Sequence, residues 1–190
     1  MRTILGGIAG GFALYLVGFL FWGTPLSMIA FSTVDDTRNA AIQTALAQNL
    51  TESGTGTYIV PWPATGQGTV MFGQGPIATV HFNTGGFPVM DSAALIAGFI
   101  LALITGAIIA FALRAVGEYV PDFARRAQVA VLFALAATLY TDLGQPIFNH
   151  YGWGYFIYLF LSNFVGLAVA GLVIARWFLP KAATGNAPPL

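Results

Sequence analysis

The chain has 190 residues, of which 57% are hydrophobic and only 7% are charged, with seven Lys and Arg balancing seven Asp and Glu. A soluble domain carries about 25% charged residues, so this composition excludes an ordinary water-soluble protein, and the high hydrophobicity excludes intrinsic disorder. The balanced charge gives no basic footprint for nucleic acid, and the absence of cysteine excludes disulfides, thiolate nucleophiles and Cys-ligated metal clusters. The composition therefore predicts an integral membrane protein.

Four apolar segments are long enough to cross a hydrocarbon core about 30 Å thick, and we predict transmembrane helices at 1–22, 92–115, 126–143 and 154–179. The first begins next to Arg2 and could be a signal peptide. Its uncharged stretch is longer than the usual core of about 7–15 residues, and no small-residue cleavage site follows, so we interpret it as an uncleaved anchor. The third is the shortest, and Gly144 and Pro146 are expected to end it.

The Lys and Arg residues predict the orientation of these helices. With the N-terminus inside, the cytoplasmic loop 116–125, the cytoplasmic tail 180–190 and the adjoining helix ends hold most of the basic residues, and Arg38 is alone outside. The inside set is Arg2, Arg114, Arg125, Arg126, Arg176 and Lys181. This bias predicts a plasma membrane or bacterial inner membrane protein with both termini cytoplasmic, the segment 23–91 outside and a short outer loop at 144–153.

The segment 23–91 is the only part outside the predicted spans that is large enough to fold. Thr33 could cap a helix that runs through Leu50. The β-rich runs 57–60, 69–72 and 77–82 predict strands, with a hairpin turn at Gln74 and Gly75. The predicted fold is thus mostly α: an integral membrane four-helix bundle with a small exported α+β segment, a short antiparallel sheet plus one helix, between the first two spans.

Small residues recur at four-residue spacing on the predicted spans, which lets helix backbones approach closely in a bilayer. The pattern predicts helix packing, either within this chain or with another chain. The candidate packing residues are Gly7, Gly11, Gly18, Gly98, Ala102, Gly106, Ala110, Ser162, Gly166 and Ala170.

Polar side chains inside the membrane are costly, and they are therefore candidates for function. Thr138 and Asp142 are one turn apart on the third span, and Asn163 lies near the middle of the fourth. They could line an outward-opening polar pocket, or they could only form hydrogen bonds between helices. We favour the second interpretation, because a single carboxylate without a basic partner is weak evidence for a transport pathway.

The sequence offers no catalytic or cofactor-binding constellation. Its Gly-x-Gly pairs do not complete a nucleotide-binding motif, so we expect no nucleotide, no cofactor and no enzymatic activity. His81 and His150 are weak candidates for a metal site, because their spacing forms no ligand signature and neither lies within a predicted span.

Four spans, cytoplasmic ends and a large β-containing first outer loop resemble the layout of the claudin family. The resemblance is one of topology, and the paired loop cysteines of that family are missing here. We expect a non-enzymatic membrane interaction protein, an accessory, assembly or structural subunit that contacts the lipid bilayer and either another membrane protein or itself. The alternative is a small transporter, channel or lipid or small-molecule binder that uses the pocket near Asp142 and Asn163.

Overall fold

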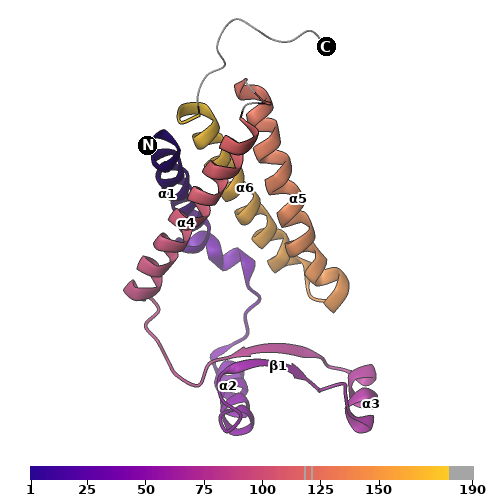
Figure 1. Cartoon of the computed structure of the whole chain (residues 1–190). Coiled ribbons are helices and arrows are strands. Elements are labelled where there is room, and N and C mark those ends of the chain that lie inside the picture. Colours follow the sequence, from indigo (N-terminus) through magenta and orange to yellow (C-terminus); the bar gives the residue numbers. More distant parts are fainter. Residues whose placement is uncertain (118, 121, 180–190) are drawn as a thin grey trace, which may run out of the picture. The chain divides into compact units, whose positions relative to one another are not determined.

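The computed structural model of the chain describes residues 1–117, 119–120 and 122–179. The predicted cytoplasmic tail, 180–190, lies outside the described residues. In chain order the elements are α1 (Arg2–Trp22), the 3-10 helix η1 (Pro25–Ala30), α2 (Asp36–Leu50), β1 (Gly56–Val60), α3 (Gly66–Gln74), β2 (Ala78–Phe82), α4 (Ser92–Val116), α5 (Phe123–Asn149) and α6 (Trp153–Trp177) (Figure 1).

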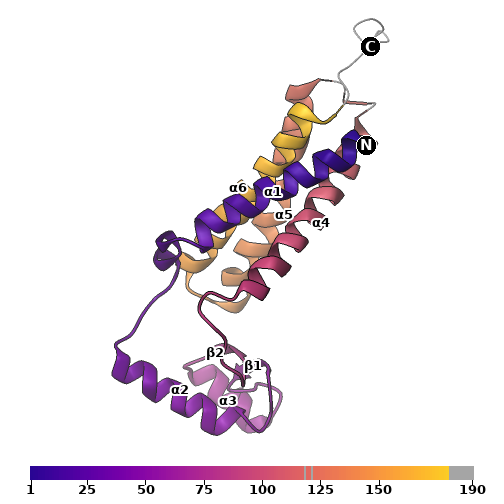
Figure 2. The ribbon, with the colours of Figure 1, turned by 90° about the vertical axis from the view of Figure 1, so that its left-hand side faces the viewer.

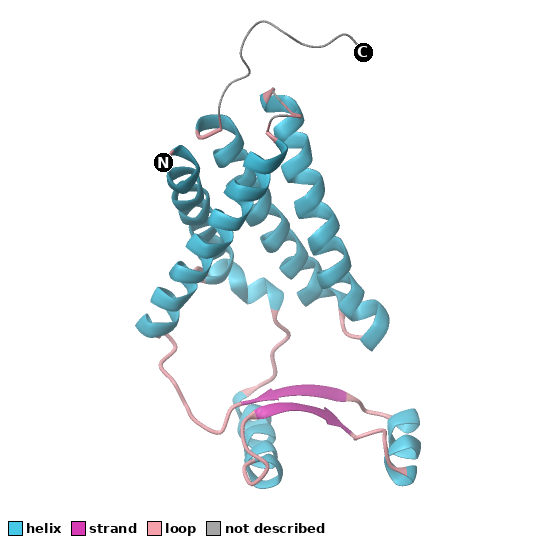
Figure 3. Cartoon of the chain, viewed as in Figure 1, coloured by secondary structure: helices cyan, strands magenta, loops and turns pink. Residues whose placement is uncertain are grey.

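The chain divides into two compact units, which we describe separately. Met1–Ser32 and Ser92–Leu190 form the first, here called the four-helix unit, and Thr33–Asp91 form the second, the α/β unit. Figure 3 shows the secondary structure of both: the four-helix unit is helical, and the two strands belong to the α/β unit.

The predicted fold class is confirmed. Among the described residues, α1, α4, α5 and α6 are long and apolar enough to cross a membrane, and a two-stranded antiparallel sheet lies between α1 and α4 in the sequence. Because large apolar side chains on these helices are exposed, their outer faces are suited to contact with lipid. The chain is therefore a multi-pass integral membrane protein.

Within the four-helix unit, α1 packs against both α4 and α6, and α5 packs along α6 (Figure 2). Successive long helices run in opposite directions, so α1 and α5 begin where α4 and α6 end. We call this the arginine end, after Arg2, Arg114, Arg125, Arg126 and Arg176, and we call the opposite end the aromatic end.

The buried core of the four-helix unit lies toward the arginine end. Ala110 and Ile174 are fully buried there, and Leu113, Ala175 and Leu179 complete the cluster. Small residues dominate this core, which fits helices held together by close backbone approach.

The third span is longer than the sequence predicts. Gly144 and Pro146 do not end it, because α5 continues through both residues to Asn149. A proline removes the hydrogen bond that its own nitrogen would donate to the carbonyl four residues earlier, here that of Asp142, and its ring crowds that carbonyl. A membrane helix tolerates this loss where neighbouring groups can compensate.

The predicted strand at 69–72 is wrong, because these residues belong to α3. Thr65 caps this helix by accepting a hydrogen bond from the Gly68 nitrogen at 3.0 Å. A Cβ on Gly68 would collide with the carbonyl oxygen of Trp62, so only glycine fits this turn. The predicted hairpin turn at Gln74 and Gly75 is consequently the end of a helix, and β1 and β2 are joined through α3.

The helix predicted from Thr33 to Leu50 is present as α2, but its cap is Asp35. The Asp35 carboxylate accepts from the Arg38 nitrogen at 2.9 Å and also pairs with the Arg38 guanidinium at 3.3 Å. A carboxylate at this position satisfies a free N–H of the first turn and opposes the positive end of the helix dipole.

Candidate functional site

A polar pocket of about 340 Å³ lies in the four-helix unit, and all four long helices line it. Its polar lining consists of Thr105 on α4, Thr138 and Thr141 on α5, and Ser162 and Asn163 on α6, while α1 contributes Leu14, Gly18 and Trp22. Asn163 is ten residues from the start of α6, so it lies about 15 Å from the aromatic end along the helix. The pocket therefore places polar groups well inside the predicted membrane-spanning region, where each of them must find a partner.

The hydroxyl groups of the pocket have their protons engaged. Thr105, Thr138 and Thr141 each donate to the carbonyl four residues earlier on their own helix, at 2.8–2.9 Å. Ser162 donates to the Leu159 carbonyl at 3.0 Å. Since each donor is used in this way, the oxygen lone pairs are what these side chains can offer to a molecule in the pocket.

Asp142 and Asn163 join α5 to α6 beside this pocket. The Asn163 side-chain nitrogen donates to one carboxyl oxygen of Asp142 at 3.0 Å, and the Thr141 hydroxyl approaches the other at 3.3 Å. Asp142 is buried, whereas Asn163 is half-buried. The predicted polar trio is thus brought together: Thr138 and Asn163 line the pocket, and Asp142 lies behind Asn163.

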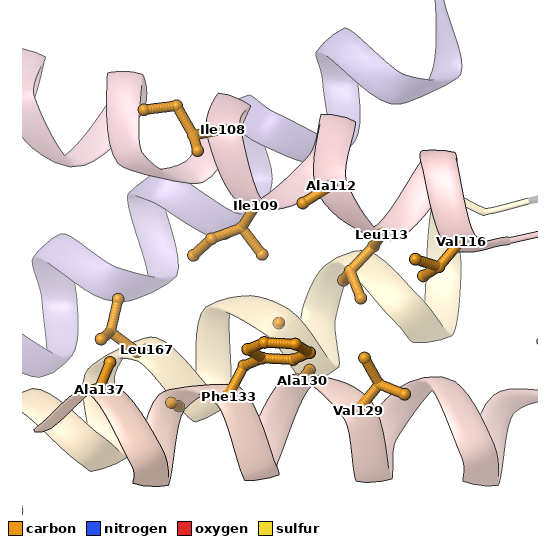
Figure 4. Close-up of a pocket in the computed structure, with 12 residues that line it drawn as sticks. Ile108, Ile109, Ala112, Leu113, Val116, Val129, Ala130, Phe133, Ala137 and Leu167 are labelled. Atoms are coloured by element: carbon orange, nitrogen blue, oxygen red, sulfur yellow. The ribbon is translucent and has the colours of Figure 1, made fainter. Parts of the chain in front are cut away.

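An apolar cleft of about 360 Å³ adjoins the polar pocket on the side of the arginine end. Its walls are α4 and α5, and α6 forms its floor (Figure 4). Figure 4 shows the side chains of Ile109, Leu113 and Phe133 between the two walls. Ala137 and Leu167 line both cavities, so the apolar cleft and the polar pocket adjoin at these two residues.

Trp22 closes the pocket from the aromatic end. Its indole nitrogen donates to the Ser162 hydroxyl at 3.0 Å, and its ring meets that of Tyr158 edge-on with centroids 5.0 Å apart. Tyr158 in turn donates to the Phe21 carbonyl at the end of α1. Trp22 and Tyr158 are site residues that the sequence does not predict, because an interfacial aromatic residue carries no sequence signal for the side chain that it meets.

Most of the predicted packing residues lie in contacts between helices of this chain, and two of them, Gly18 and Gly98, do not. Gly7, Gly11, Ala102 and Gly106 lie in the tight contact of α1 with α4, where a Cβ on Gly106 would be 2.3 Å from the Gly7 oxygen and the Gly11 nitrogen. Ala110 is buried in the core cluster.

On α6, Ser162, Gly166 and Ala170 face α1 through Trp22, Leu14 and the close approach of Gly10. By contrast, a Cβ on Gly18 would meet no described atom within 4 Å, and one on Gly98 would meet only Tyr15, at 4.0 Å. Those two glycines lie where α1 and α4 diverge toward the aromatic end.

The α/β unit has an open apolar face. In the antiparallel register Tyr58 pairs with Val80, Val60 with Ala78 and Gly56 with Phe82, which places the apolar side chains of both strands on one side, except that of Ile59. Among the described elements of this unit, only β1 and β2 pack closely on each other, and Gly68 is the only buried residue in Thr33–Asp91. This unit thus has no hydrophobic core in which its strands could bury that face.

The two histidines lie in different units. His81 on β2 forms a hydrogen bond through Nδ1 with the hydroxyl of Thr57, its cross-strand partner, at 3.0 Å. His150 follows α5 in the left-handed conformation, with φ of 55°. In the part of the chain that the structure describes, no group of three or more His, Asp or Glu residues is placed to hold a metal ion.

One buried charge was not singled out by the sequence. Arg126 on α5 donates from Nε to the Val120 carbonyl at 2.7 Å and from a terminal nitrogen to the Gly117 carbonyl at 3.2 Å. These bonds tie the start of α5 to the chain that leaves α4. The neighbouring Arg125 is largely exposed and pairs with Asp122 at 3.4 Å, so two adjacent arginines have different surroundings.

Comparison of the chain with protein families, curated proteins and solved structures finds no match. The topological resemblance to claudins therefore gains no support beyond the layout itself.

Proposed function

We propose that the chain is a non-enzymatic membrane interaction protein, an accessory, assembly or structural subunit that binds a protein partner through its α/β unit. The basic residues support an orientation with both termini in the cytoplasm and 23–91 outside, in the plasma membrane or a bacterial inner membrane. The partner is another membrane protein or a second copy of this chain, and it meets the α/β unit outside the bilayer.

The observation that carries this proposal is the apolar face of the two strands, which is only partly buried. An isolated two-stranded ribbon is at best marginally stable in water, and three strands or a packed helix are normally needed. Tyr58, Val80 and Phe82 are half-buried and Val60 is 44% exposed, although the unit contains two helices that could have covered them. Full burial of a large apolar side chain stabilises by about 1.5–3 kcal/mol, so a partner surface over this face would provide stability that the unit lacks.

The small-residue stripes support the same assignment by exclusion. Gly7, Gly11 and Gly106 already hold α1 against α4, and Gly166 and Ala170 already meet α1. Since these faces are occupied within the chain, they are not available to a partner helix. Gly18 and Gly98 are the uncovered members of the predicted set, so most of the stripe is occupied, and we assign partner binding to the α/β unit.

Cysteine labelling tests the proposal, because the natural chain contains no cysteine. Ile59→Cys and Val60→Cys form a matched pair: the parent residues are adjacent on β1, lie on opposite faces and are 39% and 44% exposed. In native membranes a membrane-impermeant maleimide should label Ile59→Cys readily and Val60→Cys at least several-fold more slowly. After the complex is dissociated and the chain is purified as a monomer, both variants should label at similar rates.

Two results would contradict the proposal. Equal labelling of both variants in native membranes would show that the apolar face is free. Protection of Val60→Cys that persists in the purified monomer would show that the chain covers this face itself. A crosslinker attached at Val60→Cys then identifies the partner as a copy of this chain or as another protein.

A further inference from the structure

We propose that the polar pocket and the apolar cleft together bind an uncharged amphiphile, a molecule with a long apolar tail and a hydroxyl-bearing head. This site lies in the four-helix unit and is independent of the protein partner proposed for the α/β unit. The tail would lie in the cleft between α4 and α5, and the head would lie among the threonine, serine and asparagine side chains.

The shape of the site fits such a molecule. The two cavities have volumes of about 340 and 360 Å³ and share Ala137 and Leu167 in their linings. Ligand pockets commonly measure about 300–1,000 Å³ and combine an apolar lining with a few placed polar groups. Here a cavity with polar side chains and an apolar cleft lie next to each other, and we infer that one molecule occupies both, with its head in the first and its tail in the second.

The hydrogen-bonding capacity of the pocket favours a head that donates. The hydroxyl protons of Thr105, Thr138 and Ser162 are bound to backbone carbonyls, so these side chains present acceptor oxygens, although that of Ser162 already accepts from Trp22. Asn163 turns its nitrogen toward Asp142, and within the described residues its oxygen has no hydrogen-bond partner. A ligand hydroxyl would supply the missing donor, which matters because an unpaired polar group is costly in this environment.

The charges around the pocket exclude an anionic head. The acidic residue beside it is Asp142, and the described arginines of the four-helix unit lie at the arginine end, beyond the apolar cleft. A phosphate or carboxylate head would therefore meet a carboxyl group and acceptor oxygens, with no cation to compensate it. A long-chain alcohol or an acylglycerol with a free hydroxyl has the required chemistry.

Photocrosslinking of the full-length protein in phosphatidylcholine nanodiscs tests this inference. The reagent is a long-chain alcohol with a diazirine in its tail, competed with unlabelled hexadecanol or with hexadecanoate. Crosslinks should map to the cleft walls of α4 and α5, and hexadecanol should compete at an at least tenfold lower concentration than hexadecanoate. Equal competition by the two compounds would overturn the proposed preference for an uncharged hydroxyl head.

Two adjacent alanines on α5 provide a matched pair of variants. Ala137 lies at the junction of the two cavities, whereas Ala136 lines neither, and both are exposed. Ala137→Leu should reduce specific crosslinking about tenfold by filling the junction, and Ala136→Leu should leave it unchanged. Equal crosslinking of both variants, or label spread over lipid-facing residues such as Leu132, would show that the alcohol only occupies bulk lipid.

A second variant tests the head site without filling space. Thr105→Val keeps the shape of the side chain and removes the acceptor oxygen, so hexadecanol should compete about fivefold less well, the effect of one lost hydrogen bond. An unchanged competition curve for Thr105→Val would overturn the placement of the head. The absence of any specific crosslink to the alcohol in the parent protein would overturn the ligand proposal. The Ile59→Cys and Val60→Cys pair tests partner binding by the α/β unit, whereas the crosslinking tests ligand binding by the four-helix unit. Failure of one proposal is therefore distinguishable from failure of the other.

Discussion

Substitution of Gly106 by alanine tests the contact that holds α1 against α4. The new Cβ would lie 2.3 Å from both the Gly7 oxygen and the Gly11 nitrogen and 2.7 Å from the Gly11 Cα. All three are backbone atoms, so no side-chain rotation can relieve the clash and the two helices must separate. Overpacking of this kind costs about 1–3 kcal/mol, and the absence of any flexible neighbour indicates the upper part of that range.

The matched control is Gly98→Ala, eight residues earlier on the same face of α4. Its Cβ would meet only a ring carbon of Tyr15, at 4.0 Å, which is an ordinary contact. Alanine is favoured over glycine inside a helix by about 0.5–1 kcal/mol, and this gain applies to both variants. The difference between the two free energies of unfolding therefore isolates the packing cost, and it should be about 2–3 kcal/mol.

Unfolding in mixed micelles by titration with a denaturing detergent, followed by circular dichroism, measures this difference. Gly98→Ala should unfold at or above the denaturant midpoint of the parent, and Gly106→Ala clearly below it. If the two variants unfold together, the close approach of α1 and α4 does not contribute to stability. If Gly98→Ala is the less stable variant, the assigned divergence of these helices toward the aromatic end is wrong.

Three further predictions concern topology, the buried carboxyl group and the buried arginine. Single cysteines at 51–56 should react with an impermeant maleimide on intact cells while cysteines at 182–190 should not, and the reverse pattern would contradict the proposed orientation. Asp142→Asn should change the free energy of unfolding by less than about 1 kcal/mol and leave assembly intact, because the new side-chain oxygen can still accept from the Asn163 amide. Loss of a transport activity in this folded variant would favour the transporter alternative. Arg126→Gln should destabilise the four-helix unit by about 1–3 kcal/mol, because two backbone carbonyls lose a charged donor. Arg125→Gln should be nearly neutral, because its ion pair is exposed. Similar denaturation midpoints for the two variants would show that the buried Arg126 does not stabilise this unit.

The existence of the four spans could be read from the sequence, because crossing a bilayer requires only length and apolarity, and both are local properties. The end of the third span could not be read in this way. Pro146 is a reliable stop signal in water, where the peptide groups that it frees can be hydrated. In an apolar surrounding the helix is retained, and α5 runs three residues beyond it.

The α/β unit shows a second limit of local patterns. The run Thr69–Val70–Met71–Phe72 has strand-like composition, but the Thr65 cap and the close approach of Gly68 to the Trp62 carbonyl start a helix three residues earlier, at Gly66. Thr65, a helix-capping residue type placed just before Gly66, was the sequence signal that could have predicted this helix. β propensity is weak where no neighbouring strand packs against the segment, so the cap decided the outcome.

The sequence by itself determined the membrane class, the number and approximate positions of the spans and the presence of polar groups within them. It could not assign partners to the small residues, because a four-residue stripe has the same pattern whether it meets the same chain or another one. Only the tertiary structure placed Gly106 against Gly7 and Gly11, left Gly18 and Gly98 uncovered, and brought Asp142 within hydrogen-bonding distance of Asn163. Contacts between helices depend on rotation and crossing in three dimensions, and these are set by all the side chains of the interface together.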